Sequence, residues 1–166
     1  MKVSLLLPGY QPHGIVAITT NLATTAYVGD TETMVYQLPF KAAPKRIYRV
    51  HLQVYAVDTD GTGDNANAAI RYAKNSMIIK CRWASGSTVT TSGSTTGEHR
   101  VTVYDDDSTT ASGADVAFYL CNPPAGQLTV GISIATARAA ATYGQVRILP
   151  GSYSYFAVED VGPFSE

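Results

Sequence analysis

Charged residues are scarce in this chain. Lys, Arg, Asp and Glu together make up 15% of its 166 residues, whereas about 25% is usual in soluble domains. The 12 basic and 13 acidic side chains give a formal net charge of -1. The chain therefore lacks the positive field that nucleic acid or an anionic membrane attracts, and we expect neither partner.

Long apolar runs are also missing. The leucines at residues 5–7 follow a lysine as in a secretory signal, but Pro8 and Gly9 interrupt the run, and a signal needs about 7–15 apolar residues. No later stretch reaches the about 18 apolar residues of a membrane-spanning helix. We expect a soluble protein made in the cytoplasm, with an extended arm over residues 1–12 and a single β-sandwich domain over residues 13–166.

Only two cysteines are present, Cys81 and Cys121. We interpret both as buried free thiols, with a disulfide as the alternative. The sequence contains no Cys-x-x-Cys pair, and none of its three histidines belongs to a zinc or nucleophile motif. We therefore expect no metal, no cofactor and no enzyme activity, and a hydrolase is the weakest alternative.

Apolar and polar side chains alternate along much of the chain, which is typical of half-buried β-strands, and a sustained helical period is nearly absent. Weaker alternation lies at about residues 14–20, 66–73, 99–104 and 145–149. With the C-terminal segment, about ten strands are expected, which suits an all-β, two-sheet sandwich of the jelly-roll kind. Residues 135–142 are interpreted as a strand end and loop. The clearest alternating segments are 34–40, 48–56, 79–83, 116–120 and 128–134.

Polar stretches between the strands are expected to be loops. Residues 84–97 are mostly Ser, Thr and Gly with almost nothing to bury, which indicates a long exposed loop, and residues 105–113 form a second one. Residues 58–65 imitate the start of a calcium-binding loop, with Gly63 at the sixth position. The twelfth position is Ala69, where a Glu is required, so we favour a hairpin loop over a calcium site.

The C-terminal segment, residues 153–163, is an aromatic strand that ends in Glu159-Asp160 and a Gly-Pro stop. Apolar side chains occupy both of its faces, so both faces need cover. Neighbouring residues of a strand point to opposite faces, which excludes Glu159 and Asp160 as paired acids that share a proton. We place Trp83 in the core, with a sugar-binding platform as the alternative.

Other strands also carry apolar side chains on both faces, and Thr129, Gly131, Ser133 and Ala135 make one face small enough for another surface to approach. A homo-oligomer explains this economically, because tyrosines bury area while keeping a polar hydroxyl. Ordinary scattered surface aromatics are the alternative. The residues expected at the assembly interface are Leu5, Leu6, Leu7, Tyr10, Tyr55, Tyr119, Tyr153 and Tyr155.

Residues 156–163, which read Phe-Ala-Val-Glu-Asp-Val-Gly-Pro, resemble the C-terminal signature of β-sandwich domains in minor tail proteins of actinobacterial phages. Residues 13–17, 32–35 and 46–50 resemble the opening strands of such domains, so the resemblance covers about residues 12–163. It implies a virion structural module, usually a trimeric β-sandwich on the particle surface. Small capsid decoration proteins use the same kind of trimer without a stalk.

The resemblance leads us to expect a non-enzymatic virion structural protein that forms a homotrimer on the virion surface. Its partners would be its own copies and other capsid or tail proteins, which the arm would contact. The alternative function is a receptor-binding adhesin that recognises host cell-wall glycan through exposed tyrosines and loop residues.

Overall fold

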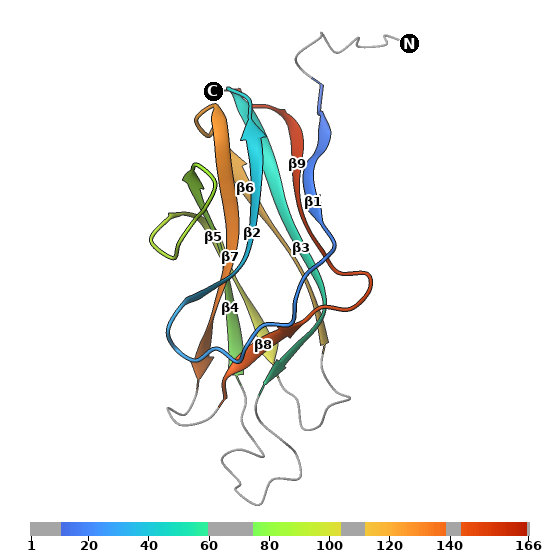
Figure 1. Ribbon diagram of the computed structural model, residues 1–166, viewed down its shortest axis with the longest axis vertical. Helices are drawn as coiled ribbons and strands as arrows, with labels where there is room; N and C mark the ends of the chain where they lie inside the picture. Colours follow the sequence, from blue (N-terminus) through green and yellow to red (C-terminus); the bar gives the residue numbers. More distant parts are fainter. Residues whose placement is uncertain (1–10, 60–74, 104–111, 139–143, 166) are drawn as a thin grey trace, which may run out of the picture.

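The computed structural model describes residues 11–59, 75–103, 112–138 and 144–165, and these residues form two packed β-sheets (Figure 1). No helix that could span a membrane occurs in these ranges. The expected all-β sandwich is confirmed, with nine strands, and the weak run at residues 66–73 lies outside the described residues. The strands are β1 (Gly14–Thr19), β2 (Thr33–Ala42), β3 (Arg46–Thr59), β4 (Asn75–Ser85), β5 (Ser94–Val103), β6 (Ser112–Cys121), β7 (Gly126–Arg138), β8 (Val146–Leu149) and β9 (Tyr155–Pro163).

The strand order is that of a jelly roll. Sheet A has the order β1-β9-β3-β6, with β8 paired to the end of β3, and sheet B has the order β2-β7-β4-β5. All of these pairings are antiparallel. The chain changes sheet at most connections, so strands that are distant in sequence become neighbours, as in the double Greek key of jelly rolls. The first and last strands, β1 and β9, therefore lie side by side (Figure 1).

The hydrophobic core lies between the two sheets and uses about every second residue of most strands, with little from β1 and β5. Sheet A contributes Tyr48, Val50 and Leu52 from β3 and Phe156 from β9, all essentially inaccessible to solvent. Sheet B contributes the alternating apolar residues of β7, from Leu128 to Ile134. Burying each large side chain of this kind contributes about 1.5–3 kcal/mol to stability. The alternation of apolar and polar residues in the sequence therefore indicates which side chains face the core.

The two cysteines have different surroundings. Cys81 is a buried free thiol whose pKa is raised to about 12, mainly by desolvation. Cys121 is also free but exposed, so the expectation that both thiols are buried is wrong for this residue. It ends β6 on the outer side of sheet A, where it pairs with Ile47. Trp83 on β4 is partly buried and packs against the core.

The expectation of a long exposed loop over residues 84–97 holds only for its middle: residues 86–93 connect two strands and most of them are exposed, whereas both ends of the range belong to strands. Strand β4 runs to Ser85 and β5 begins at Ser94, so the connection is short, and it folds back onto the outer side of sheet B. Val89 in this connection is buried, and its Cγ1 would lie only 2.6 Å from a Cβ added to Gly131. Its backbone N–H donates to Gln37 Oε1 at 2.8 Å. The small residues of β7 are thus covered by the chain's own loop.

A charged cluster lies beside this loop on the same side of sheet B. The carboxylate of Glu32 accepts hydrogen bonds from Arg82 at 2.7 and 2.8 Å, from Lys80 at 3.2 Å and from Ser133 at 2.6 Å. The hydrogen bonds from Arg82 are the main reason why the pKa of Glu32 falls from 4.5 to about 2. A loop and an ion-pair cluster of the chain itself therefore cover the outer side of β7, whereas the outward residues of β5 remain exposed.

Candidate assembly surface

The outer side of sheet A is the candidate functional surface, because the register of four strands gathers apolar and aromatic side chains there. Ile15 of β1 pairs with Glu159 of β9, which pairs with Arg49 of β3, which pairs with Tyr119 of β6. The neighbouring row runs through Ile18, Ala157, His51 and Ala117 in the same way. We call this surface the sheet A face; it consists of Ile15, Ile18, Arg49, His51, Ala117, Tyr119, Tyr155, Ala157 and Glu159.

The sheet A face leaves large apolar side chains in contact with solvent. Ile15 is 60% exposed, Ile18 50% and Tyr119 57%. A shallow depression of about 360 Å³ lies among Ile15, Ile18, Tyr155, Ala157 and their polar neighbours. Single exposed apolar residues are common on protein surfaces, but a contiguous group of them marks an interaction site.

A hydrogen-bonded chain crosses the middle of the face. The hydroxyl of Tyr155 lies 3.1 Å from His51 Nδ1, and His51 Nε2 lies 2.6 Å from Asp115 Oδ1. In the neutral imidazole this places the proton on Nε2, where it donates to the carboxylate, and leaves Nδ1 to accept from the phenol. In a catalytic relay the carboxylate is buried, whereas the Asp115 side chain is 66% exposed. The geometry is that of a cross-strand ladder which fixes the tyrosine and histidine rings.

A buried ion pair anchors one end of the face. Arg46 and Asp160 are 4% and 1% exposed, and Arg46 Nε donates to both carboxylate oxygens at 2.9 and 3.1 Å. The backbone N–H of Gly162 donates to the same carboxylate at 3.0 Å. Arg46 also donates to the carbonyl of Gln11 at 2.6 Å, and His13 Nδ1 lies 3.3 Å from Asp160. Residues just after the arm are thereby tied to β3 and β9.

This anchor explains the spacing of the terminal Glu-Asp-Val-Gly-Pro sequence. Asp160 points into the sandwich and bonds Arg46, whereas Glu159 points outwards and lies 3.6 Å from Arg49. The hydrogen bonds that Arg46 donates to the Asp160 carboxylate raise the pKa of the Arg46 guanidinium. Gly162 has a φ of 137°, a conformation that side chains with a Cβ rarely adopt. Glu159, Asp160 and Gly162 of the motif therefore each have a structural role.

The structure brings together only some of the residues expected at an interface. Tyr119 and Tyr155 lie on the sheet A face. Tyr119 belongs to β6 and pairs with Arg49, whereas Tyr155 lines the depression. Tyr55 and Tyr153 are 74% and 88% exposed and belong to the far end of the sheet, where the Tyr55 backbone N–H donates to the Ser154 hydroxyl at 2.9 Å. The remaining four, Leu5, Leu6, Leu7 and Tyr10, lie outside the described residues.

Sequence reasoning did not identify Ile15, Ile18, Arg49 and His51 as part of the surface. The reason for the two isoleucines is a β-bulge at Val16, since the register between β1 and β9 shifts between Ile15 and Ala17. A bulge inserts one residue, so two side chains three positions apart share a face and the period of two is broken. Nothing in a single strand pattern indicates this shift.

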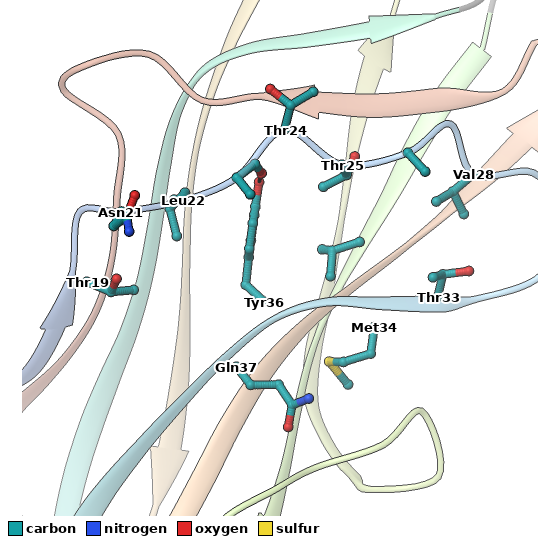
Figure 2. Close-up of a pocket in the computed structure, with 13 residues that line it drawn as sticks. Thr19, Asn21, Leu22, Thr24, Thr25, Val28, Thr33, Met34, Tyr36 and Gln37 are labelled. Atoms are coloured by element: carbon teal, nitrogen blue, oxygen red, sulfur yellow. Dashed lines mark hydrogen bonds between the residues drawn. The ribbon is translucent and has the colours of Figure 1, made fainter.

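A second hollow, of about 480 Å³, lies between β2 and the segment that joins β1 to β2 (Figure 2). Tyr36 crosses from β2 towards that segment, and its hydroxyl donates to the carbonyl of Ala23 at 2.8 Å. Burial raises the pKa of Tyr36 to about 12. The lining is made of threonines, the amides Asn21 and Gln37, and apolar side chains such as Leu22 and Met34. The hollow thus offers hydroxyl and amide groups but no charged group.

The stretch that imitates a calcium loop begins at Asp58, and this carboxylate is already engaged. Arg147 Nε donates to it at 2.6 Å and the Tyr27 hydroxyl at 3.1 Å, while the Arg147 guanidinium lies 4.4 Å from the centre of the Tyr27 ring. Residues 60–65 of the stretch lie outside the described residues. Within the described ranges, no three His, Cys, Asp or Glu side chains are grouped so that they could hold a metal ion.

Fold and surface together define a jelly-roll β-sandwich whose sheet B is partly covered by its own chain and whose sheet A presents exposed apolar side chains at its edges. The chain belongs to a family described as a domain of unknown function (DUF7298), whose model matches residues 1–166. A search of curated proteins gives no match.

Proposed function

We propose that this protein is a non-enzymatic structural component of a bacteriophage virion, of the minor tail or capsid decoration type, displayed on the particle surface as a homotrimer. The observation that carries the proposal is the sheet A face, where Ile15 and Ile18 at one edge and Tyr119 at the other are at least half exposed. The paired side chains of Glu159 and Arg49 lie between these edges. Such a surface is a liability on a monomer and is covered by a partner in an assembly.

The residues behind the resemblance to phage tail domains give further support. Arg46 and Arg49 in one matching stretch are the ion-pair partners of Asp160 and Glu159 in the other. The resemblance thus rests on residues that bond to each other and hold β3 and β9 of sheet A together. Short sequence matches carry more weight when they share one structural purpose.

A receptor-binding adhesin for cell-wall glycan is the second candidate, and Tyr55 and Tyr153 favour it. They are the two most exposed large apolar side chains of the described residues, at 74% and 88%. Exposed aromatic rings offer a flat apolar surface with a polar hydroxyl, which suits stacking on a sugar ring with hydrogen bonds at its edge.

Two measurements test the proposal. Multi-angle light scattering of the full chain at micromolar concentration should give three times 17.7 kDa, about 53 kDa, and a monomer mass would refute the homotrimer. Antibodies against the protein should label purified phage particles in electron micrographs. Binding of the isolated protein to whole host cells or to a glycan array, without particle labelling, would favour the adhesin instead.

A further inference from the structure

We infer that the hollow between β2 and the segment that joins β1 to β2 is a binding site for a neutral saccharide, either a free sugar or one unit of a glycan. We call this segment, residues 20–32, the β1–β2 strap. The inference does not depend on the proposed homotrimer, and the hollow shares no residue with the exposed pair Tyr55 and Tyr153. Three properties of the hollow support it: its fixed walls, its neutral polar lining and its size.

Hydrogen bonds to β8 hold the strap in place. The backbone N–H of Thr25 donates to the carbonyl of Ile148 at 3.1 Å, and the backbone N–H of Ile148 donates to the Thr25 hydroxyl at 2.9 Å. Val28 exchanges two backbone hydrogen bonds with Val146, at 2.8 and 3.0 Å. One wall of the hollow is therefore fixed by the fold itself, which lowers the conformational entropy that a ligand must overcome when it binds.

Two local features keep the hollow open. Residues 23–26 of the strap read Ala-Thr-Thr-Ala, and these side chains are too short to fill the space between the strap and the sheet. Facing them, the register of β2 with β7 shifts between Met34 and Tyr36, and every residue from Thr33 to Gln37 lines the hollow. Bulges of this kind are frequent at sheet edges and beside functional sites, because they redirect side chains.

The polar groups of the lining are able to bind hydroxyl groups. Asn21 is exposed, so its amide offers both donors and an acceptor. The Thr25 hydroxyl accepts from Ile148 and keeps its own O–H to donate. The Tyr36 hydroxyl donates to Ala23 and keeps a lone pair to accept. Each hydroxyl of a sugar is both a donor and an acceptor, so it can pair with any of these groups.

The same lining disfavours charged ligands and purely apolar ones. Among the described residues that line the hollow, none is Lys, Arg, His, Asp or Glu, so an ionic ligand would lose its hydration without gaining a counter-ion. A purely apolar ligand would leave the threonine and amide groups without partners. A sugar ring presents C–H groups as well as hydroxyls, and Leu22, Met34 and Val35 supply apolar surface for them. A neutral saccharide therefore suits both parts of the lining.

The size and shape of the hollow favour a compact ligand over an extended peptide. Its volume of about 480 Å³ lies within the range of about 300–1,000 Å³ that is usual for small-molecule sites. A peptide that added a strand to this sheet would pair with the free edge of β2, which is an edge strand of sheet B. Tyr36 crosses from β2 to Ala23 of the strap and interrupts that edge (Figure 2). A continuous additional strand therefore has no path there.

The test is a titration of the isotope-labelled full-length protein with sugars, followed by NMR through its backbone amides. The neutral probes are glucose, galactose, mannose and N-acetylglucosamine, together with their methyl glycosides. At least one should cause saturable shifts at residues 21–26 and 33–37, with a dissociation constant in the millimolar range or below. A methyl glycoside that binds as well as the free sugar identifies a glycan unit as the ligand, whereas loss of binding identifies a free sugar.

Two charged sugars are matched controls for the neutral lining. Glucuronate carries a carboxylate that glucose lacks, and glucosamine carries an ammonium group where N-acetylglucosamine has a neutral amide. Each charged sugar should bind at least about 10-fold more weakly than its neutral counterpart, because the hollow offers no counter-ion.

Two substitutions locate the binding in the hollow. Asn21→Ala removes an exposed amide from the lining and should weaken binding at least about 10-fold. Its matched control, Gln53→Ala, removes an amide from β3 outside the hollow and should leave binding unchanged. Leu22→Ala removes part of the apolar wall and should weaken binding at least about 3-fold. The dispersion of the amide spectrum checks that each variant is folded.

The inference is overturned if no neutral sugar shifts the amides of the hollow, if the charged sugars bind equally well, or if Asn21→Ala and Leu22→Ala bind as the wild type does. Shifts centred on Tyr55 and Tyr153 instead would also overturn it and would favour the adhesin. None of these results bears on the homotrimer, which light scattering tests by itself, so the inference and the proposed function can fail separately.

Discussion

Replacing Asp160 by asparagine removes the charge of a side chain that is 1% exposed while keeping its shape nearly unchanged. The substitution leaves the buried guanidinium of Arg46 without its counter-ion, although the amide oxygen still accepts one of its hydrogen bonds. Breaking a buried ion pair by removing one partner costs about 3–5 kcal/mol, because an uncompensated charge remains in the interior. We expect a loss of this size in the free energy of unfolding.

Glu159→Gln is a matched control one residue away. Glu159 lies on the same strand but points outwards, and its partner Arg49 is 3.6 Å distant with both side chains partly exposed. An exposed pair of this kind contributes about 0.2–1 kcal/mol. The two variants change the same functional group in the same strand, so the difference between them measures burial alone.

The assay is unfolding by urea, with thermal melting as a second reading. For a domain of this length a loss of 1 kcal/mol lowers the melting temperature by about 2–4 °C, so Asp160→Asn should melt about 6–20 °C below the wild type. Glu159→Gln should melt within about 4 °C of it. If the two variants lose the same stability, the assignment of Arg46 and Asp160 as the anchor of sheet A is wrong.

A double variant separates the charge from the space it fills. Arg46→Met with Asp160→Leu replaces the ion pair by apolar side chains of similar bulk, and such replacements are often neutral or stabilising. The hydrogen bonds to Gln11 and Gly162 are lost in the double variant, so part of the damage remains. We expect the double variant to lose less stability than the sum of the losses in Arg46→Met and Asp160→Leu; additive losses would contradict the pairing.

Three further predictions follow from other parts of the structure. The pKa of Glu32 in the folded protein is about 2, below its ordinary value of 4.5, so the stability that its charge contributes is complete above about pH 4.5 and disappears as the pH falls towards 2. In urea unfolding, Glu32→Gln should cost up to about 3 kcal/mol at pH 7 and well under 1 kcal/mol at pH 2. A cost that does not change with pH would contradict this prediction. Gly131→Ala should lower the free energy of unfolding by about 1–3 kcal/mol and make the loop around Val89 sensitive to proteases, because the added Cβ would lie 2.6 Å from Val89 Cγ1. An unchanged digestion pattern would show that the loop does not depend on this contact. In a Cys121→Ser protein, Cys81 should react with a maleimide only after unfolding, since it is buried and its pKa is about 12; labelling of the native protein would show that β4 opens.

The alternation of side chains was sufficient to predict the fold class, because in a two-sheet sandwich every second residue of a strand faces the core and is apolar. Val50, Leu52 and Val54 follow this rule on β3, as do Val130 and Ile132 on β7. The same rule failed for β5. This strand lies at the edge of sheet B and its residues are mostly solvent-exposed polar ones, so Ser94–Val103 was in part interpreted as loop.

Contacts between distant segments could not be read from local patterns. Asp160 and Arg46 are 114 residues apart, and Glu32 and Arg82 are 50 apart, and no periodicity links such positions. The bulge at Val16 is equally invisible, since it depends on how β1 pairs with β9. The members of the sheet A face therefore emerged only when the register of four strands was known.

The sequence by itself determined that this protein is an all-β sandwich with a low charge content and with apolar residues on both sides of several strands, because side-chain alternation is a local property. Only the tertiary structure decided which of those outward apolar sides is covered. Val89 folds over Gly131 and covers the outer side of β7, whereas Ile15 and Ile18 remain exposed on sheet A. The physical reason is that cover depends on which segments the jelly-roll crossovers bring together, and these crossovers join residues that are distant in the chain.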